Sequence, residues 1–149
     1  MIPKFRAYDG SSLNRMYQPD EVMVGNGDIW IIDEDSVAGE WIVNNDLHLM
    51  QSTGILDKNS QEIFEGDILE IQGIRMVVKF GSYEYIESSK SNGHTIGVVY
   101  EGLGFYVECI NAADPDRISP FEPKTLKESA VIGNVYENKE LLEDANETL

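Results

Sequence analysis

Two segments of alternating apolar and polar residues, 67–72 and 74–80, flank a single glycine, Gly73. Successive side chains of a β-strand point to opposite faces. The second segment therefore places four large apolar side chains on one face: Ile74, Met76, Val78 and Phe80. Glycine supplies the positive φ that a tight reversal requires. The sequence predicts a β-hairpin around Gly73, and this period of two favours a sheet structure.

Further segments rich in β-branched and aromatic residues lie on both sides of this hairpin. They are 5–8, 21–24, 28–32, 41–43, 46–50, 95–100, 103–110 and 131–136. Gly25-Asn26-Gly27 and Glu101-Gly102 separate neighbouring segments and predict two more hairpins. Gly97 and Gly104 lie inside predicted strands and indicate bulges or close backbone approach. The segment 81–93 is polar and aromatic by turns, and its form stays open.

Helical signals are confined to the C-terminal region. Three prolines, Pro115, Pro120 and Pro123, keep the chain after residue 110 irregular, with at most one helical turn near 124–128. Asn138 is a predicted N-cap for a short helix that carries Leu141, Leu142 and Ala145. These many short strands and one helix favour a mainly β fold, with antiparallel hairpins forming a barrel-like or sandwich core.

A chain of 149 residues suits one folded unit, 1–149. Within it we expect an N-terminal β region, 1–52, and a hairpin core with the terminal helix, 53–149. Between them, Gly54 and Gly66 suit unusual backbone angles on either side of a turn. Asp67 after Gly66 resembles the strand entry of small SH3-like barrels, so we interpret this stretch as architectural.

The charge balance is strongly acidic, with 27 Asp and Glu against 11 Lys and Arg and a formal net charge of −16. No Lys or Arg occurs between Arg15 and Lys58. A surface of this sign repels phosphate, so direct nucleic-acid binding over this face is not expected. Whether the charge serves a partner or only solubility stays open.

Cysteine and histidine are scarce. Cys109 has no second cysteine to pair with, and only His48 and His94 accompany it, so neither an intramolecular disulfide nor a zinc site is expected. No apolar segment approaches the roughly 20 residues that span a bilayer. We therefore expect a protein of the reducing cytoplasm that does not interact with membranes.

Four acids near the centre of the chain, Asp57, Glu62, Glu65 and Asp67, could meet a hard cation. Their spacing fails the calcium-loop pattern, because Glu62 stands at the glycine position and Ile68 at the bidentate acid. The acidic segment 33–35 fails in the same way. No phosphate loop, dinucleotide fingerprint or serine elbow occurs, and we predict no catalytic, cofactor-binding or metal-binding residue.

Three separate pieces of the chain carry a family resemblance. They are 5–9 with Met16-Tyr17; the central 49–54 and 57–68; and 131–138 with Leu141-Leu142. In this order they resemble the YopX family of phage and prophage proteins, known mainly from Gram-positive bacteria. The signature residues are Phe5, Arg6, Asp9, Gln51, Gly54, Asp57, Glu65, Gly66, Asp67, Gly133, Asn134, Tyr136 and Asn138. Tyr8 and Lys139 depart from the family pattern, which often has Trp and Pro there.

The resemblance implies a mostly β fold and a phage-encoded accessory protein, and it supplies no catalytic residues. Our first hypothesis is a non-enzymatic interaction module in the bacterial host, binding an unidentified host or phage protein, with self-association into a homo-oligomer left open. A second hypothesis is an acidic decoy that occupies the nucleic-acid site of a host protein. A third is a metal-dependent hydrolase that uses the four central acids. Whether the protein is an enzyme stays open, with binding favoured.

Overall fold

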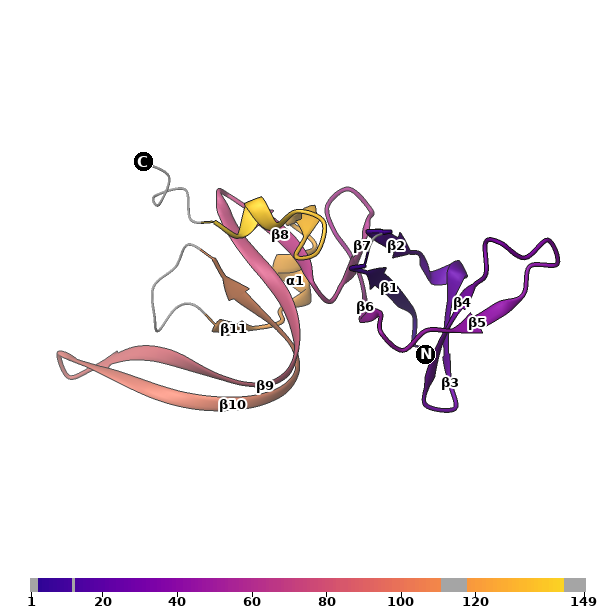
Figure 1. Ribbon diagram of the computed structural model, residues 1–149. Coiled ribbons are helices and arrows are strands. Elements are labelled where there is room, and N and C mark those ends of the chain that lie inside the picture. Colours follow the sequence, from indigo (N-terminus) through magenta and orange to yellow (C-terminus); the bar gives the residue numbers. More distant parts are fainter. Residues whose placement is uncertain (1–2, 12, 111–117, 144–149) are drawn as a thin grey trace.

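The computed structural model describes residues 3–11, 13–110 and 118–143, which form three antiparallel sheets (Figure 1). The described helical segments are short: a 3-10 turn at Pro19–Glu21, the α-helix α1 at Pro123–Leu126 and a second 3-10 turn at Lys139–Leu142. The predicted mainly β fold class is therefore confirmed. No helix among these residues is long and apolar enough to cross a membrane.

Two sheets form the N-terminal half. The first has the order β2-β1-β6-β7, with β1 Phe5–Asp9, β2 Arg15–Tyr17, β6 His48–Leu56 and β7 Glu62–Phe64. The second consists of β3 Val22–Gly25, β4 Asp28–Ile32 and β5 Trp41–Val43. The hairpin predicted at residues 25–27 is confirmed, because Asn26 and Gly27 both have positive φ between β3 and β4. Side chains from both sheets share a core that includes Ala7, Tyr17, Val22, Ile31 and Leu47.

The third sheet is curled and has the order β11-β10-β9-β8-β12 (Figure 1). Its strands are β8 Asp67–Ile71, β9 Ile74–Ser91, β10 His94–Cys109, β11 Ile118–Pro120 and β12 Ala130–Asn134. The hairpin predicted around Gly73 is confirmed, with Gln72 and Gly73 at positive φ between β8 and β9. The second core includes Ile63, Leu69, Met76, Val78, Val107 and Leu126.

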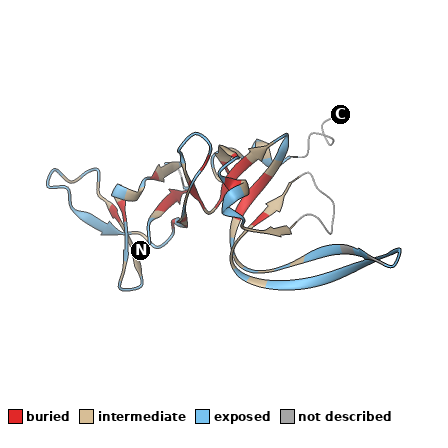
Figure 2. Cartoon of the chain, turned by 180° about the vertical axis from the view of Figure 1, so that it is seen from behind, coloured by how far each residue is buried: buried red, intermediate tan, exposed pale blue. Residues whose placement is uncertain are grey.

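Strands β9 and β10 continue far beyond this core as a two-stranded ribbon (Figure 1). We call residues 81–104 the arm. Figure 2 shows buried residues gathered in the two cores and exposed residues along most of the arm. The reversal lies at Asn92-Gly93, where both residues have positive φ. The segment 81–93, whose form the sequence leaves open, therefore consists of the outer part of β9 and the turn that follows it.

The hairpin predicted at Glu101-Gly102 is wrong, because both residues lie inside β10 and pair with Glu84 and Tyr83 of β9. Gly102 instead makes room for a side chain of the neighbouring strand. A Cβ atom at this position would lie 2.3 Å from Cζ of Tyr83, so glycine leaves room for the tyrosine ring. A glycine next to a polar residue is typical of a turn, but Gly102 marks a close side-chain approach inside the strand.

Gly81 and Gly104 face each other where the arm leaves the body, with φ of 149° and 138°. The register of β9 and β10 runs without a shift, so Gly104 marks no bulge. Backbone angles of this kind are accessible almost only to glycine. The glycine pair therefore permits the bend at the base of the arm.

The C-terminal helix is reduced to the 3-10 turn Lys139–Leu142, and the predicted Ala145 lies outside the described residues. Asn138 does not cap it through its side chain, because its Oδ1 accepts the N–H of Asn134 instead. Strand β11 was not predicted, since it ends in Pro120 and pairs only at the edge of β10. Strand β6 passes through the expected boundary between 52 and 53, and the division into sub-regions stays a prediction.

We expect Gly104→Ala to loosen the base of the arm, because alanine at a φ of 138° is strained by about 1–3 kcal/mol. Amide hydrogen exchange in 77–83 and 102–108 should speed up accordingly. Gly97→Ala is the matched control, since Gly97 lies in the same strand without a positive φ and a Cβ there would meet Ile86 at an ordinary 3.5 Å. Equal exchange in the two variants would contradict the role of the glycine pair.

Candidate functional site

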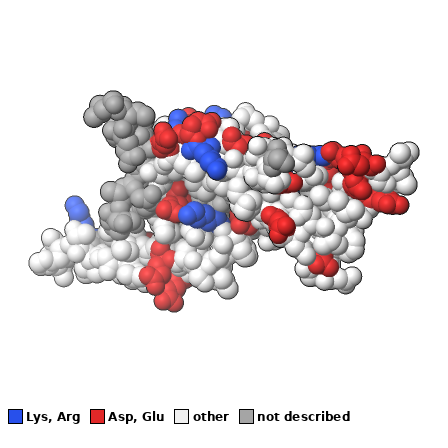
Figure 3. Space-filling model, viewed as in Figure 1, with Lys and Arg blue, Asp and Glu red and all other residues white. Residues whose placement is uncertain are grey.

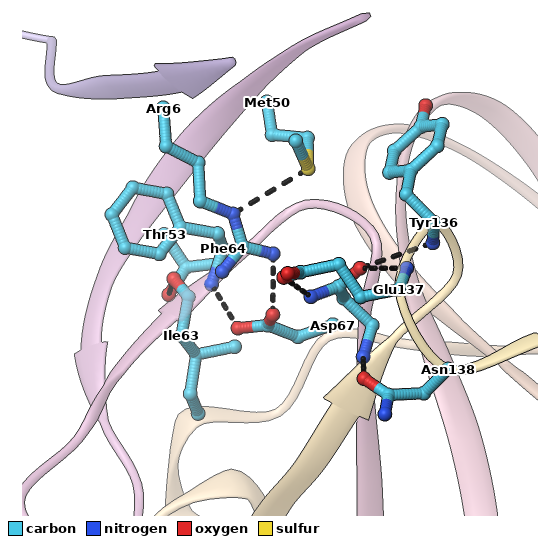
Figure 4. A network of polar contacts seen from close by, with 10 residues as sticks. Arg6, Met50, Thr53, Ile63, Phe64, Asp67, Tyr136, Glu137 and Asn138 are labelled. Carbon is cyan, nitrogen blue, oxygen red and sulfur yellow. Dashed lines mark hydrogen bonds and ion pairs between the residues drawn. The ribbon is translucent and has the colours of Figure 1, made fainter. Parts of the chain in front are cut away.

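A buried ion pair lies where the N-terminal sheet meets the curled sheet (Figure 4). Nη2 of Arg6 on β1 is 2.5 Å from Oδ1 of Asp67 at the start of β8, and the two side chains are 9% and 1% exposed. Oδ2 of Asp67 accepts the Phe64 N–H at 2.7 Å. The guanidinium also donates to Sδ of Met50 and lies over the Phe64 ring, 4.7 Å from its centroid. Residues 61 positions apart in the sequence are thus fixed in one place.

The loop after β12 closes against this junction. Oδ1 of Asn134 accepts the N–H groups of Tyr136 and Glu137, and Oδ1 of Asn138 accepts the N–H of Asn134. Gly133 is required beside it, because a Cβ atom there would lie 2.6 Å from the Asn138 oxygen. The Val135 N–H then donates to the carbonyl of Gly66, which has a φ of 85°. These asparagines hold the loop against the turn that leads into Asp67.

Asp57 joins the central turn to β12. Its Oδ1 accepts the N–H groups of Asn59 and Gln61, and its Oδ2 accepts the N–H of Val131 at 2.9 Å. Burial raises the pKa of the Asp57 carboxyl, but the three N–H donors together outweigh burial, so its pKa lies below the usual 3.8. The ionised carboxylate therefore stabilises the folded state.

Three more groups at the junction have shifted pKa values. Burial raises the pKa of Asp67, and the opposing effects of Arg6 and the Phe64 N–H do not cancel it. Burial also raises the pKa of Glu65 and, together with the Glu65 charge, that of Tyr136. The Tyr136 ring stacks on both Tyr8 and His48, with centroids 5.3 and 4.8 Å away. These shifts follow from packing at the junction.

The remaining signature residues have local structural contacts. Phe5 packs against the N-terminal core, and Oδ1 of Asp9 accepts the Ser11 N–H. The Gln51 carbonyl accepts the Glu65 N–H, while Gly54 has a φ of 77° where the register between β6 and β7 shifts. The structure thus brings Arg6, Gly66, Asp67, Gly133, Asn134, Tyr136 and Asn138 together at one junction. The other signature residues lie around it.

The four central acids do not form a ligand set. Asp57 and Asp67 are engaged as described, Glu62 pairs with Lys4, and among the described residues no group of three His, Cys, Asp or Glu could hold a metal ion. The acidic segment 33–35 is a turn in which Asp33 accepts the Asp35 N–H. His48 stacks on Tyr136, whereas His94 begins β10 at the end of the arm. The hydrolase hypothesis therefore has no assembled site.

The chain belongs to the YopX family, because the family model described as YopX protein matches residues 4–143. Among solved structures it is similar to the crystal structure of protein EF1440 from Enterococcus faecalis. The two sequences are 25% identical, the match covers 96% of this chain and 99% of that one, and the TM-score is 0.48. No curated protein matches the chain.

One surface of the arm and its base was not predicted from the sequence. Four tyrosines stack along one side of the ribbon, and we call them the tyrosine face: Tyr83, Tyr85, Tyr100 and Tyr106. Tyr83 stacks on Tyr106 at 4.8 Å and Tyr85 on Tyr100 at 5.3 Å. Loss of solvation of the Tyr85 hydroxyl among the stacked rings, together with the negative charge of nearby Glu87, raises the pKa of Tyr85. Two features of the sequence indicate this surface. Asn92-Gly93 is a strong hairpin turn, and Tyr83 and Tyr85 before it are two residues apart, so they lie on one face of the strand.

A hollow of about 900 Å³ opens at the base of the arm. Its lining includes Tyr83, Tyr106 and Leu103 from the ribbon and Ile118 from β11, together with Glu84 and Glu101. Leu103 is 82% exposed. A hollow that combines aromatic rings and exposed Leu103 with two glutamates can receive a side chain of another protein.

We expect Arg6→Met to lower the free energy of unfolding by about 3–5 kcal/mol, because it leaves the buried Asp67 carboxylate without its cation. Lys4→Met is the matched control: it breaks the exposed Lys4–Glu62 pair and should cost no more than about 1 kcal/mol. Urea unfolding of both variants provides the comparison. Similar losses in the two variants would show that the Arg6–Asp67 pair is not a special constraint.

Asp57 predicts a pH dependence of defined sign. Its pKa is lower in the folded than in the unfolded state, so its contribution is full above the usual 3.8 and is lost as pH falls through the folded pKa. We expect Asp57→Asn to be less stable than wild type by about 1–3 kcal/mol at neutral pH. The difference should shrink in urea unfolding at acidic pH. A difference that stays constant or grows as pH falls would contradict this assignment.

Proposed function

We propose that the protein is a non-enzymatic accessory module of phage or prophage origin that acts in the host cytoplasm and binds a partner protein through its arm. The observation that carries the proposal is the tyrosine face on a ribbon that extends from the body (Figure 1). Tyrosines are enriched at protein interfaces, because a rigid ring offers a large contact area at low entropic cost and its hydroxyl can hydrogen-bond.

The distribution of charge supports the arm rather than the body as the contact. The arm carries three glutamates and one lysine among residues 81–104, in a chain with a net charge of −16. Figure 3 shows few charged groups on the arm, a basic one near its outer end and acidic ones closer to its base, and several separate acidic patches on the body. Charged residues are depleted at interface centres, since desolvating them costs free energy.

The junction supports the same function in another way. Residues from the three signature pieces are engaged with one another in a buried network, which fixes how the two halves of the body join. A rigid body is a suitable base for a projecting contact element, because less conformational freedom is lost on binding. The signature residues therefore support the arm and need not touch the partner.

The test is affinity capture from a bacterial host lysate with a variant that removes two rings, Tyr85→Ser with Tyr100→Ser. We expect it to lose proteins that the wild type retains. Val24→Ser with Ile42→Ser is the matched control, since these side chains are about as exposed as Tyr100, at 42% and 43% against 41%, but lie in the three-stranded sheet. Circular dichroism establishes that both variants are folded.

Capture that is unchanged in the tyrosine variant would contradict the proposal. If the retained proteins were eluted by salt and displaced by DNA, the acidic-decoy hypothesis would replace it. Turnover of a defined substrate by the purified protein would overturn the non-enzymatic assignment.

A further inference from the structure

The side of the arm opposite the tyrosine face continues the core-facing side of the curled sheet. Met76 and Val78 of β9 and Val107 of β10 point into the core. Alternation carries the same side outward through Phe80, which is already 50% exposed. We call its continuation on the arm the core-side face: Glu84, Ile86, Lys90, Val99, Glu101 and Leu103.

The apolar part of the core-side face is uncovered in a single chain. Ile86 and Val99 are directly opposite each other in the register and are 39% and 59% exposed. The next cross-strand pair on this same face, toward the tip, is Ser88 and Gly97. A ridge of two branched side chains therefore lies beside a pair that offers only a serine side chain. A ridge next to a shallow position is self-complementary when a second copy approaches in the opposite direction.

The charged residues of this face are also divided along the arm, with two acids toward its base and one lysine toward its tip. Glu84 and Glu101 are directly opposite each other, and like charges in that position destabilise a strand pair. Lys90, the only Lys or Arg of the arm, lies on the same face near the tip. Figure 3 shows a basic group near the outer end of the arm and acidic groups closer to its base.

We propose that the core-side face binds the core-side face of a second copy, with the two arms antiparallel about a two-fold axis. Lys90 of each copy then lies over the Glu84 and Glu101 pair of the other, because the axis passes midway between these positions. The same axis places each Ile86 and Val99 ridge over the Ser88 and Gly97 position of the other copy. One geometry therefore satisfies both the charges and the shape.

The charges decide between a second copy and a different occupant. A partner with a continuous acidic surface would be repelled by Glu84 and Glu101, whereas a continuous basic surface would match that pair but bring a like charge against Lys90 near the tip. Two antiparallel copies bring opposite charges together twice. The contact runs from Glu84 to Lys90 in each arm, a length of roughly 20 Å at about 3.3 Å per residue, and it is smaller than a standard interface. The dimer is therefore reversible and depends on protein concentration.

This inference rests on the proposed function, since it assumes that the arm is an interaction element. It assigns the face opposite the tyrosine face, and Glu84, Glu101 and Leu103 of that face also line the hollow at the base of the arm. Analytical ultracentrifugation of the full chain over roughly 10 µM to 1 mM should show a monomer–dimer equilibrium in the range expected for a small interface. We expect two charge variants to weaken dimerisation by about tenfold or more, because like charges then meet. The first is the single variant Lys90→Glu, and the second is the double variant Glu84→Lys with Glu101→Lys.

Mixing these two charge variants should restore the dimer, because opposite charges meet again at both ends of the contact. Glu87→Lys is the control, since Glu87 lies on the tyrosine side of the arm and its reversal should leave dimerisation unchanged. A monomeric wild type at the highest concentration, a dimer insensitive to both charge variants, or no recovery on mixing would each overturn the proposal.

The two proposals fail separately. If the protein stays monomeric while Tyr85→Ser with Tyr100→Ser still abolishes partner capture, the second-copy contact is wrong and the interaction function stands. If the charge variants behave as expected while the tyrosine variant captures the same proteins as wild type, the dimer stands and the partner contact is wrong.

Discussion

The ion pair between Arg6 and Asp67 is the constraint on which the rest of the structure depends. Burying two charges costs several kcal/mol per ion, and this cost is offset only when geometry and additional hydrogen bonds are good. Here the Phe64 N–H and the Phe64 ring complete the surroundings of the pair. A shift of either sheet would leave a buried charge without its partner. The pair therefore selects one arrangement of the two halves even if its net contribution to stability is small.

That fixed arrangement gives the arm its base. The core-facing side of β9 and β10 is covered as far as Val78 and Val107, and beyond Phe80 the same alternation continues without cover. The ribbon is thus not a separate element added to the body. It is the extension of the central hairpin past the point where the core ends, bent at Gly81 and Gly104.

Much of the fold followed from local patterns. The hairpins around Gly73 and at residues 25–27 were predictable, because turn residues and alternation agree there. The pattern failed at Glu101-Gly102, where the glycine serves a tyrosine on the neighbouring strand. The signature pieces were also evident in the sequence, but the pairing of Arg6 with Asp67 was not, since no local rule links residues 61 positions apart. The tyrosine face depends on cross-strand register, which was open until the turn was placed.

The uninterrupted register of the arm makes its length adjustable. Removing two residues from each strand shortens the ribbon by about 7 Å and returns every remaining side chain to its former face, because the period is two. The body is unaffected, since the bend precedes the change. Antiparallel pairing, however, matches the distance from tip to base in one chain against the same distance in the other. Arms of unequal length would satisfy the contact between Lys90 and the Glu84 and Glu101 pair at one end only, because the other lysine would lie over Ile86 and Val99. The length of the arm is therefore a criterion by which a chain selects a partner of its own kind.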